Sequence, residues 1–164
     1  MMARDQPTAV AIESLYRARY GRFLRVATAI VGDEAAGHDA VQEGFALALQ
    51  ECRSFRGDGP LEGWVWRVVS NAALGVRRAQ MALREAPDSV ADPASRNGHV
   101  DEVGVRTWVA ALPERQRLAV YLRYYADLDY RAIASALDVE VGTVSATLSA
   151  AHQALRRSLE EVER

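Results

Sequence analysis

The sequence predicts an all-α protein in which two small helical domains are joined by a flexible linker. Apolar residues recur three or four positions apart over most of the chain, as on one face of an α-helix, and strand-like alternation is almost absent. Residues 84–101 break this pattern, because they hold two prolines, several small polar residues and few apolar ones. The predicted domains are therefore residues 1–83 and 102–164.

Residues 1–83 are predicted to form a bundle of three amphipathic helices. The first helix covers Thr8–Val31, and Asp33 is a candidate N-cap for the second. A glycine-bearing loop over residues 53–59 precedes a third helix, which Pro60 can open. Gly75 lies inside this third helix. Because a mid-helix glycine costs up to about 1 kcal/mol relative to alanine, we expect the helix to fray there.

The segment Tyr130–Arg157 predicts two helices folded across a short turn. Asp138 follows the last apolar residue of the first helix, where a left-handed backbone is favoured, and Gly142-Thr143 can open and cap the second helix. The second helix has one apolar face, made of Val144, Leu148, Ala151 and Leu155. Helix-turn-helix proteins place such a second helix in the DNA major groove, and an ordinary helical hairpin in an all-α core has the same periodicity.

Charge and cysteine content narrow the class of protein. The twenty basic residues are all arginine and the formal net charge is −2, so no overall positive field indicates nucleic-acid binding. Cys52 is the single cysteine, which excludes an internal disulfide and is typical of a reducing compartment. Residues 1–11 lack the apolar core of a signal peptide, and no apolar run approaches membrane-spanning length. We therefore expect a cytoplasmic protein without membrane insertion.

Enzymatic functions find little support in the sequence. Gly57-Asp58-Gly59 has neither the preceding strand nor the spacing of a phosphate-binding loop. The three histidines are scattered and, with one cysteine, form no metal-binding pattern. We expect a protein that is not an enzyme, with no catalytic residue, metal, cofactor or small-molecule substrate.

Separate blocks of sequence resemble the extracytoplasmic-function (ECF) sigma factors of bacterial RNA polymerase. DAVQEGF (Asp39–Phe45) and FRGDGPLEGWVWRVVSN (Phe55–Asn71) are similar to region 2 of this family. LPERQRLAVYLRYYADLDYRAIASALDVEVGTV (Leu112–Val144) is similar to region 4. The resemblance implies a subunit that directs core polymerase to promoters. It also implies a region 2-like three-helix bundle, a region 4-like helix-turn-helix domain and an anti-sigma factor as a further partner.

The resemblance implies that the helix carrying the first block docks on core polymerase. The matching positions are Asp39, Gln42, Glu43 and Phe45. Asp39 and Glu43 lie one helical turn apart, so their carboxylates can meet arginines of a partner protein. A solvated acidic face would show the same spacing.

The resemblance also implies that residues 55–78 capture the non-template strand of the −10 promoter element. Holding unstacked bases requires aromatic or arginine stacking and hydrogen bonds to base edges. Trp64 and Trp66 could supply aromatic surface, although Trp64 shares a helix face with Val68, which favours a place in the core. The residues that we assign to the −10 element are Phe55, Arg56, Arg67, Asn71, Arg77 and Arg78.

By the same resemblance, the second helix of the helix-turn-helix corresponds to the reader of the −35 element. The candidates on this helix are Thr143, Ser145, Thr147, Ser149, His152 and Arg156. Family members usually place lysine or arginine on this face. Since phosphate neutralisation supplies much of the affinity for DNA, we expect weak binding by this helix alone. Further phosphate contacts are expected from arginines on neighbouring helices, namely Arg115, Arg117, Arg123 and Arg131.

Two alternatives differ from a sigma factor in what they bind. A sigma-like decoy would occupy an anti-sigma factor or polymerase without reading −35 DNA. A helix-turn-helix regulator would bind duplex DNA without polymerase, but it leaves the N-terminal block unexplained.

Overall fold

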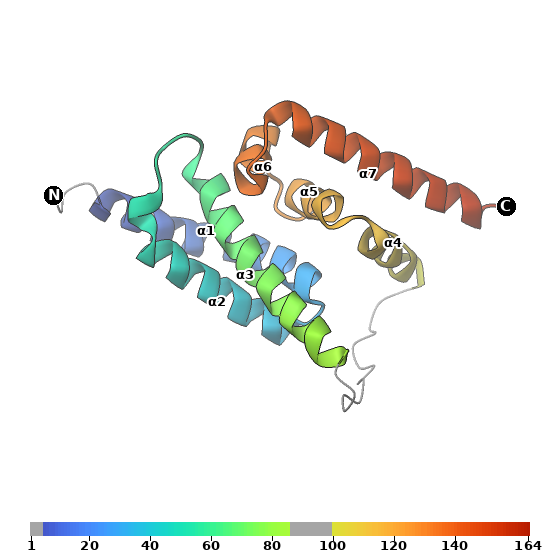
Figure 1. Ribbon diagram of the computed structural model, residues 1–164, viewed down its shortest axis with the longest axis horizontal. Coiled ribbons are helices and arrows are strands. Elements are labelled where there is room, and N and C mark those ends of the chain that lie inside the picture. Colours follow the sequence, from blue (N-terminus) through green and yellow to red (C-terminus); the bar gives the residue numbers. More distant parts are fainter. Residues whose placement is uncertain (1–4, 86–99) are drawn as a thin grey trace.

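The computed structural model describes residues 5–85 and 100–164. Within these ranges the chain is built from helices, and the prediction of an all-α protein is confirmed. Figure 1 shows two groups of helices side by side, α1–α3 and α4–α7. The elements are α1 (Asp5–Val31), α2 (Glu34–Gln50), the 3-10 turn η1 (Cys52–Ser54), α3 (Leu61–Arg84), α4 (Val100–Ala111), α5 (Glu114–Tyr124), α6 (Tyr130–Leu137) and α7 (Val141–Val162).

Local capping explains where the first helices begin and end. The carboxylate of Asp33 accepts a hydrogen bond of 2.8 Å from the backbone N–H of Ala36, so the predicted N-cap of α2 is confirmed. Gly32, just before it, has a φ of +81°, which lets the chain turn sharply after α1. The predicted fraying at Gly75 is wrong. The helix α3 runs through this position to Arg84, because the residues preceding Gly75 are anchored in the core.

The core of the first domain is a cluster of aromatic rings between α1, α2 and α3. Trp66 is completely buried and stacks on Phe23, with ring centroids 3.8 Å apart. Phe45 meets the edges of Phe23 and Tyr16 at centroid distances of 4.8 and 4.9 Å. Such edge-to-face and stacked pairs stabilise a core beyond simple area burial. This cluster fixes the rotation of each helix, and therefore decides which side chains reach the surface.

The second domain contains the predicted helix-turn-helix. Asp129 caps α6 by accepting from the backbone N–H of Ala132 at 2.8 Å, and Asp138 takes the predicted left-handed conformation, with φ 55° and ψ 51°. The predicted apolar face of α7 is buried at Val144, Leu148 and Ala151. The expectation that Gly142-Thr143 opens and caps α7 is wrong. This helix begins at Val141 after Glu140, with no side-chain cap.

The predicted linker, residues 84–101, lies mostly outside the described residues. At its two ends the described chain is helical, since Arg84 ends α3 and Val100 begins α4.

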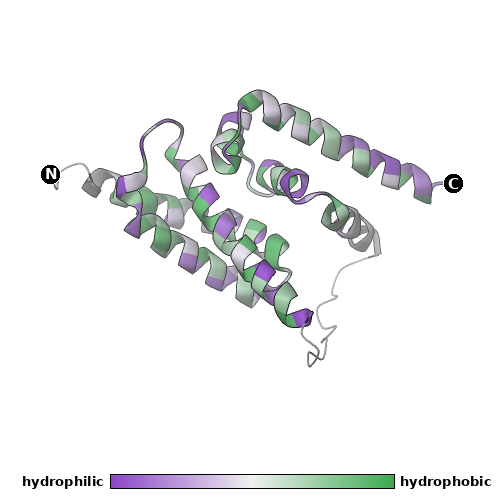
Figure 2. Cartoon of the chain, viewed as in Figure 1, coloured by the Kyte–Doolittle hydropathy of each residue, from purple (hydrophilic) through white to green (hydrophobic). Residues whose placement is uncertain are grey.

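Figure 2 shows hydrophilic residues concentrated along the C-terminal half of α7, which extends away from the first domain. Within the described part of the chain, no helix combines the length and the apolar character needed to span a bilayer.

The two domains contact each other mainly through α3 and α6, with a smaller contact between α1 and α5. Gly63 on α3 makes the closest approach. A Cβ atom at this position would lie 2.6 Å from the Cβ of Ser135 on α6, so only glycine fits without displacing α6. This packing places the face of α3 that carries Gly63 and Arg67 directly beside the helix-turn-helix.

Candidate functional site

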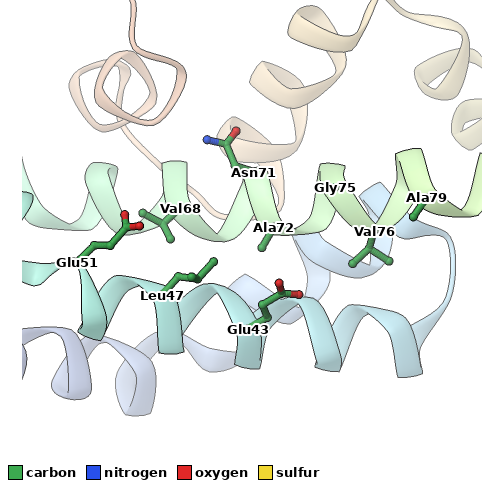
Figure 3. Close-up of a pocket in the computed structure, with 9 residues that line it drawn as sticks. All are labelled: Glu43, Leu47, Glu51, Val68, Asn71, Ala72, Gly75, Val76 and Ala79. Atoms are coloured by element: carbon green, nitrogen blue, oxygen red, sulfur yellow. The ribbon is translucent and has the colours of Figure 1, made fainter.

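The exposed face of α2 carries three of the four residues assigned to polymerase binding. Asp39, Gln42 and Glu43 are exposed, and Glu43 also borders a groove of about 560 Å³ between α2 and α3. Figure 3 shows how this groove runs between Glu43 and Leu47 on α2 and Val76 on α3. Neither Asp39 nor Glu43 forms a salt bridge within the described part of the chain. Their charges therefore remain available to a partner.

Phe45 does not belong to this exposed face. Its side chain is only 4% exposed and packs on Tyr16 and Phe23 in the aromatic core. The assignment of Phe45 as a polymerase contact is therefore corrected, because a buried ring cannot touch another protein. The polymerase role of Phe45 came from the family resemblance, whereas its spacing from Val41 and Ala48 places it on the apolar side of α2.

The loop before α3 places aromatic and cationic groups at the surface. Phe55 is half-buried against Trp64, with ring centroids 5.7 Å apart, and Arg56 is exposed beside it. These residues line a crevice of about 620 Å³ whose opposite wall is the turn between α6 and α7. Trp66, which could have stacked on bases according to the sequence, is excluded from that role by its complete burial. Trp64 packs against the core from a half-buried position, which agrees with the preference stated for it.

The arginines of α3 differ in what they bind. The Nε and Nη2 atoms of Arg67 donate to the carbonyl oxygen of Ser135, at 3.0 and 2.8 Å. Arg77 donates to the carbonyl oxygen of Ile30 at 3.2 Å, so it holds α3 to α1. The Nη2 atom of Arg78 forms an ion pair with Oε1 of Glu114 at 3.3 Å. The side chain of Asn71 is exposed. The six −10 candidates are thus not one continuous surface.

The face of α7 predicted to read DNA is accessible. Thr143, Ser145, Ser149, His152 and Arg156 are exposed, while Thr147 is half-buried and donates its hydroxyl to the carbonyl oxygen of Thr143 at 2.7 Å. That bond occupies the only hydroxyl proton of Thr147 and leaves its oxygen as an acceptor. This part of α7 therefore offers small polar groups, one imidazole and one guanidinium.

Tyr124 on α5 belongs to the same surface and was missed by sequence reasoning. Its hydroxyl lies 2.8 Å from Nε2 of His152, and its side chain is 58% exposed. The hydrogen bond fixes the orientation of the imidazole on α7. Because α5 and α7 are distant in sequence, spacing within either helix gave no signal for this pair.

Two of the four arginines expected to reach DNA phosphates are engaged inside the domain. Arg117 is buried and donates to the carbonyl oxygens of Ala110 and Leu112, at 2.8 and 3.4 Å. Burial first, and then the nearby Arg77, lower the pKa of Arg117 below its ordinary value. Arg123 donates to the carbonyl oxygen of Leu128 at 3.0 Å and lies over the ring of Tyr130. The expectation is therefore corrected for these two residues.

Arg115 and Arg131 are the other two arginines of that set, and both are exposed. Arg131 also borders the crevice between the domains. These two side chains therefore stay at the surface, and their contact with phosphates stays a prediction.

Two protein families match this chain, one in each domain. The family described as "Sigma-70 region 2" matches residues 15–82, and that described as "Sigma-70, region 4" matches residues 104–155. The ECF RNA polymerase sigma-E factor of Escherichia coli K12 is 31% identical over 136 residues, covering 71% of this chain and 70% of that protein. The ECF RNA polymerase sigma factor SigE of Mycolicibacterium smegmatis is 26% identical over 162 residues, covering 93% of this chain and 63% of that protein.

Solved structures share the fold. CnrH, in complex with the cytosolic domain of CnrY, superimposes with a TM-score of 0.72 at 19% identity, covering 96% of this chain and 95% of CnrH. The sigma factor RpoE of Bartonella quintana, in complex with the anti-sigma factor NepR, superimposes with a TM-score of 0.66 at 19% identity, covering 90% of this chain and 96% of RpoE.

Proposed function

Because the chain belongs to the ECF sigma factors of the sigma-70 family, which direct bacterial core RNA polymerase to promoters, we propose how its two domains divide this work. Residues 1–83 bind core polymerase and the −10 element, and residues 102–164 read the −35 element. The observation that carries this proposal is the accessible face of α7. This helix buries Val144, Leu148 and Ala151 and leaves its polar side open.

For polymerase binding we propose the exposed face of α2. Asp39 and Glu43 lie one turn apart and present two carboxylates in the same direction, with Gln42 beside them. Charges that are exposed before binding accelerate association with an oppositely charged surface and set its orientation. Phe45 contributes indirectly, because its ring in the aromatic core fixes the rotation of α2.

For the −10 element we propose Phe55, Arg56 and Asn71 as the first contacts. Arg56 can stack on an unpaired base or meet a phosphate, and the amide of Asn71 can bond a base edge. The ring of Phe55 packs against Trp64, which supports the loop before α3. Arg67 and Arg78 reach the strand only after they leave their present partners, and Arg77 helps to hold α3 in place.

For the −35 element we propose the exposed residues of α7 together with Tyr124. Serine and threonine hydroxyls can contact base edges or phosphates, and Arg156 supplies a phosphate contact. Because this face has few cations, its affinity for duplex DNA is low without polymerase, and its salt dependence is shallow. Promoter recognition therefore depends on polymerase holding both domains at once.

We also propose an anti-sigma factor as a partner. CnrH and the Bartonella RpoE are both solved in complexes, and NepR is an anti-sigma factor. In this chain the exposed apolar residues Val141, Leu159 and Val162 along α7 supply surface that such a partner could cover.

Run-off transcription with purified bacterial core polymerase and a promoter library tests the proposal. We expect specific transcripts only when this chain is added. A decoy would capture polymerase and give no transcript, whereas a helix-turn-helix regulator would bind duplex DNA and leave polymerase unaffected. Either of those results would reject the assignment.

Two sets of variants separate the proposed steps in the same assay. Asp39→Asn with Glu43→Gln should weaken polymerase capture, and Glu160→Gln with Glu161→Gln on α7 is the control with the same change in charge. Arg56→Ala should instead leave polymerase capture intact and impair promoter opening. Equal loss of both steps in Arg56→Ala would contradict the division of roles.

A further inference from the structure

Two glycines, one on α3 and one in the loop before it, let this part of the first domain touch α6. A Cβ at Gly63 would lie 2.6 Å from the Cβ of Ser135 and 2.8 Å from the carbonyl oxygen of Ala132, and a Cβ at Gly59 would lie 3.2 Å from the hydroxyl of Ser135. Both glycines thus open a notch that receives Ser135. Figure 1 shows α6 beside the N-terminal half of α3, and the two helices are in contact.

Arginines of the first domain hold the second domain in this position. Arg67 lies one turn after Gly63, and two of its nitrogens donate to the carbonyl oxygen of Ser135. This oxygen lies at the C-terminal end of α6, where the helix dipole places partial negative charge. The side chain of Asp138 adds an ion pair at 3.3 Å. Elsewhere in the interface Arg22 donates to the carbonyl oxygen of Ala126 at 3.2 Å, and Arg78 pairs with Glu114.

The contact involves four of the six −10 candidates and leaves the −35 face open. Of the six −10 candidates, Arg67 and Arg78 bind the second domain, and Phe55 and Arg56 line the crevice whose other wall is the α6–α7 turn. By contrast, the polar face of α7 is exposed, apart from half-buried Thr147. The planar guanidinium of Arg67 cannot bind Ser135 and be aimed at a nucleotide at the same time.

The contact is also polar and partly exposed, so it can open. The Arg67 side chain is 35% exposed and its partner Asp138 is 81% exposed, while Arg78 and Glu114 are 68% and 47% exposed. Exposed ion pairs contribute little stability, and polar contacts between domains are typical of interfaces that move.

We propose that α6 and the non-template strand of the −10 element compete for the face of α3 that carries Gly63 and Arg67. In the closed chain α6 occupies this face, and the chain must open between α3 and α6 before the strand can bind. This inference rests on the assignment of the −10 element to the first domain. Strand binding and opening are linked equilibria. If opening raises the affinity for the strand by a given factor, strand binding must raise the ratio of open to closed chain by the same factor.

Two variants open the contact from opposite sides. Ser135→Leu leaves the face of α3 intact and is used to measure strand affinity, whereas Gly63→Leu alters that face and tests opening alone. Gly63→Leu pushes a side chain from α3 into Ser135, and Ser135→Leu pushes one from α6 into the notch. Gly21→Leu is the matched control, because Gly21 also lies inside a helix and nothing lies within 4 Å of its Cβ position. If Gly63→Leu does not fold, Ser135→Leu still tests the contact.

The readouts are the distance between the domains and the affinity for the strand, both measured on the full chain. Donor and acceptor dyes are attached to Ala18→Cys on α1 and Glu161→Cys on α7, which are exposed sites, in a Cys52→Ser background. The DNA probe is a labelled single strand with the −10 sequence of a promoter found by run-off transcription. We expect both opening variants to lower energy transfer, and Ser135→Leu to raise strand affinity, on the order of threefold to tenfold.

Strand binding should also lower energy transfer in the wild-type chain. Unchanged energy transfer in both opening variants would show that the contact does not hold the chain closed. In Ser135→Leu, lower energy transfer with unchanged strand affinity would show that α6 and the strand do not compete. If run-off transcription gives no specific transcript, the proposed function itself fails, and the competition fails with it. Normal transcription together with either of the first two results overturns the competition alone.

Discussion

Phe45 provides the sharpest test of how the first domain is built. The ring is 4% exposed and forms edge-to-face pairs with Tyr16 and Phe23. Each such pair contributes about 0.5–1.5 kcal/mol, so Phe45→Leu, which keeps an apolar side chain, should lower the free energy of unfolding by about 1–3 kcal/mol. Phe45→Ala also leaves a cavity and should cost about 3–5 kcal/mol.

Urea unfolding and polymerase affinity, measured on the same samples, distinguish a core ring from a contact residue. Phe45→Leu should lose stability and keep most of its polymerase affinity under conditions in which it is folded. Gln42→Ala, on the exposed face of α2, is the control. It should keep its stability within about 0.5 kcal/mol and lose affinity. A Phe45→Leu chain that is as stable as wild type but binds polymerase poorly would refute the placement of this ring in the core.

Two further predictions concern backbone positions. Gly44→Ala should lower the free energy of unfolding by about 1–3 kcal/mol, because its Cβ would lie 2.7 Å from the Cα of Val69. Gly21→Ala should instead raise the free energy of unfolding by about 0.5–1 kcal/mol, because nothing lies within 4 Å of its Cβ position. If the melting temperatures of both variants shift in the same direction, this account of the packing is contradicted. At Asp138, whose φ is 55°, alanine should cost about 1–2 kcal/mol and glycine should be tolerated. Equal melting temperatures for Asp138→Ala and Asp138→Gly would show that the left-handed turn is not maintained.

The local features of this fold were readable because their causes lie within a few residues. Asp33 caps α2 by accepting from the N–H three residues later, and Asp138 ends α6 where the apolar periodicity stops. The apolar spacing of α7 likewise identified the face that the second domain buries. Features of this kind depend on backbone geometry that every helix shares, so sequence spacing is enough to find them.

The positions and partners of the site residues depended on contacts between distant parts of the chain. Trp64 and Trp66 are two residues apart, and only the aromatic cluster with Phe23 decides that Trp66 is the one completely buried. The bond between Tyr124 and His152 likewise requires two separate helices to meet in one register.

The sequence by itself therefore determined the all-α architecture, the helix ends at Asp33 and Asp138, and the family to which the chain is similar. The tertiary structure decided which side chains are free to act. Arg67 looked available on α3, yet it binds the end of α6, because the absence of a side chain at Gly63 lets the two domains touch. A helical period gives the direction of each side chain around its own axis. What that direction faces is set by packing against helices that lie elsewhere in the sequence.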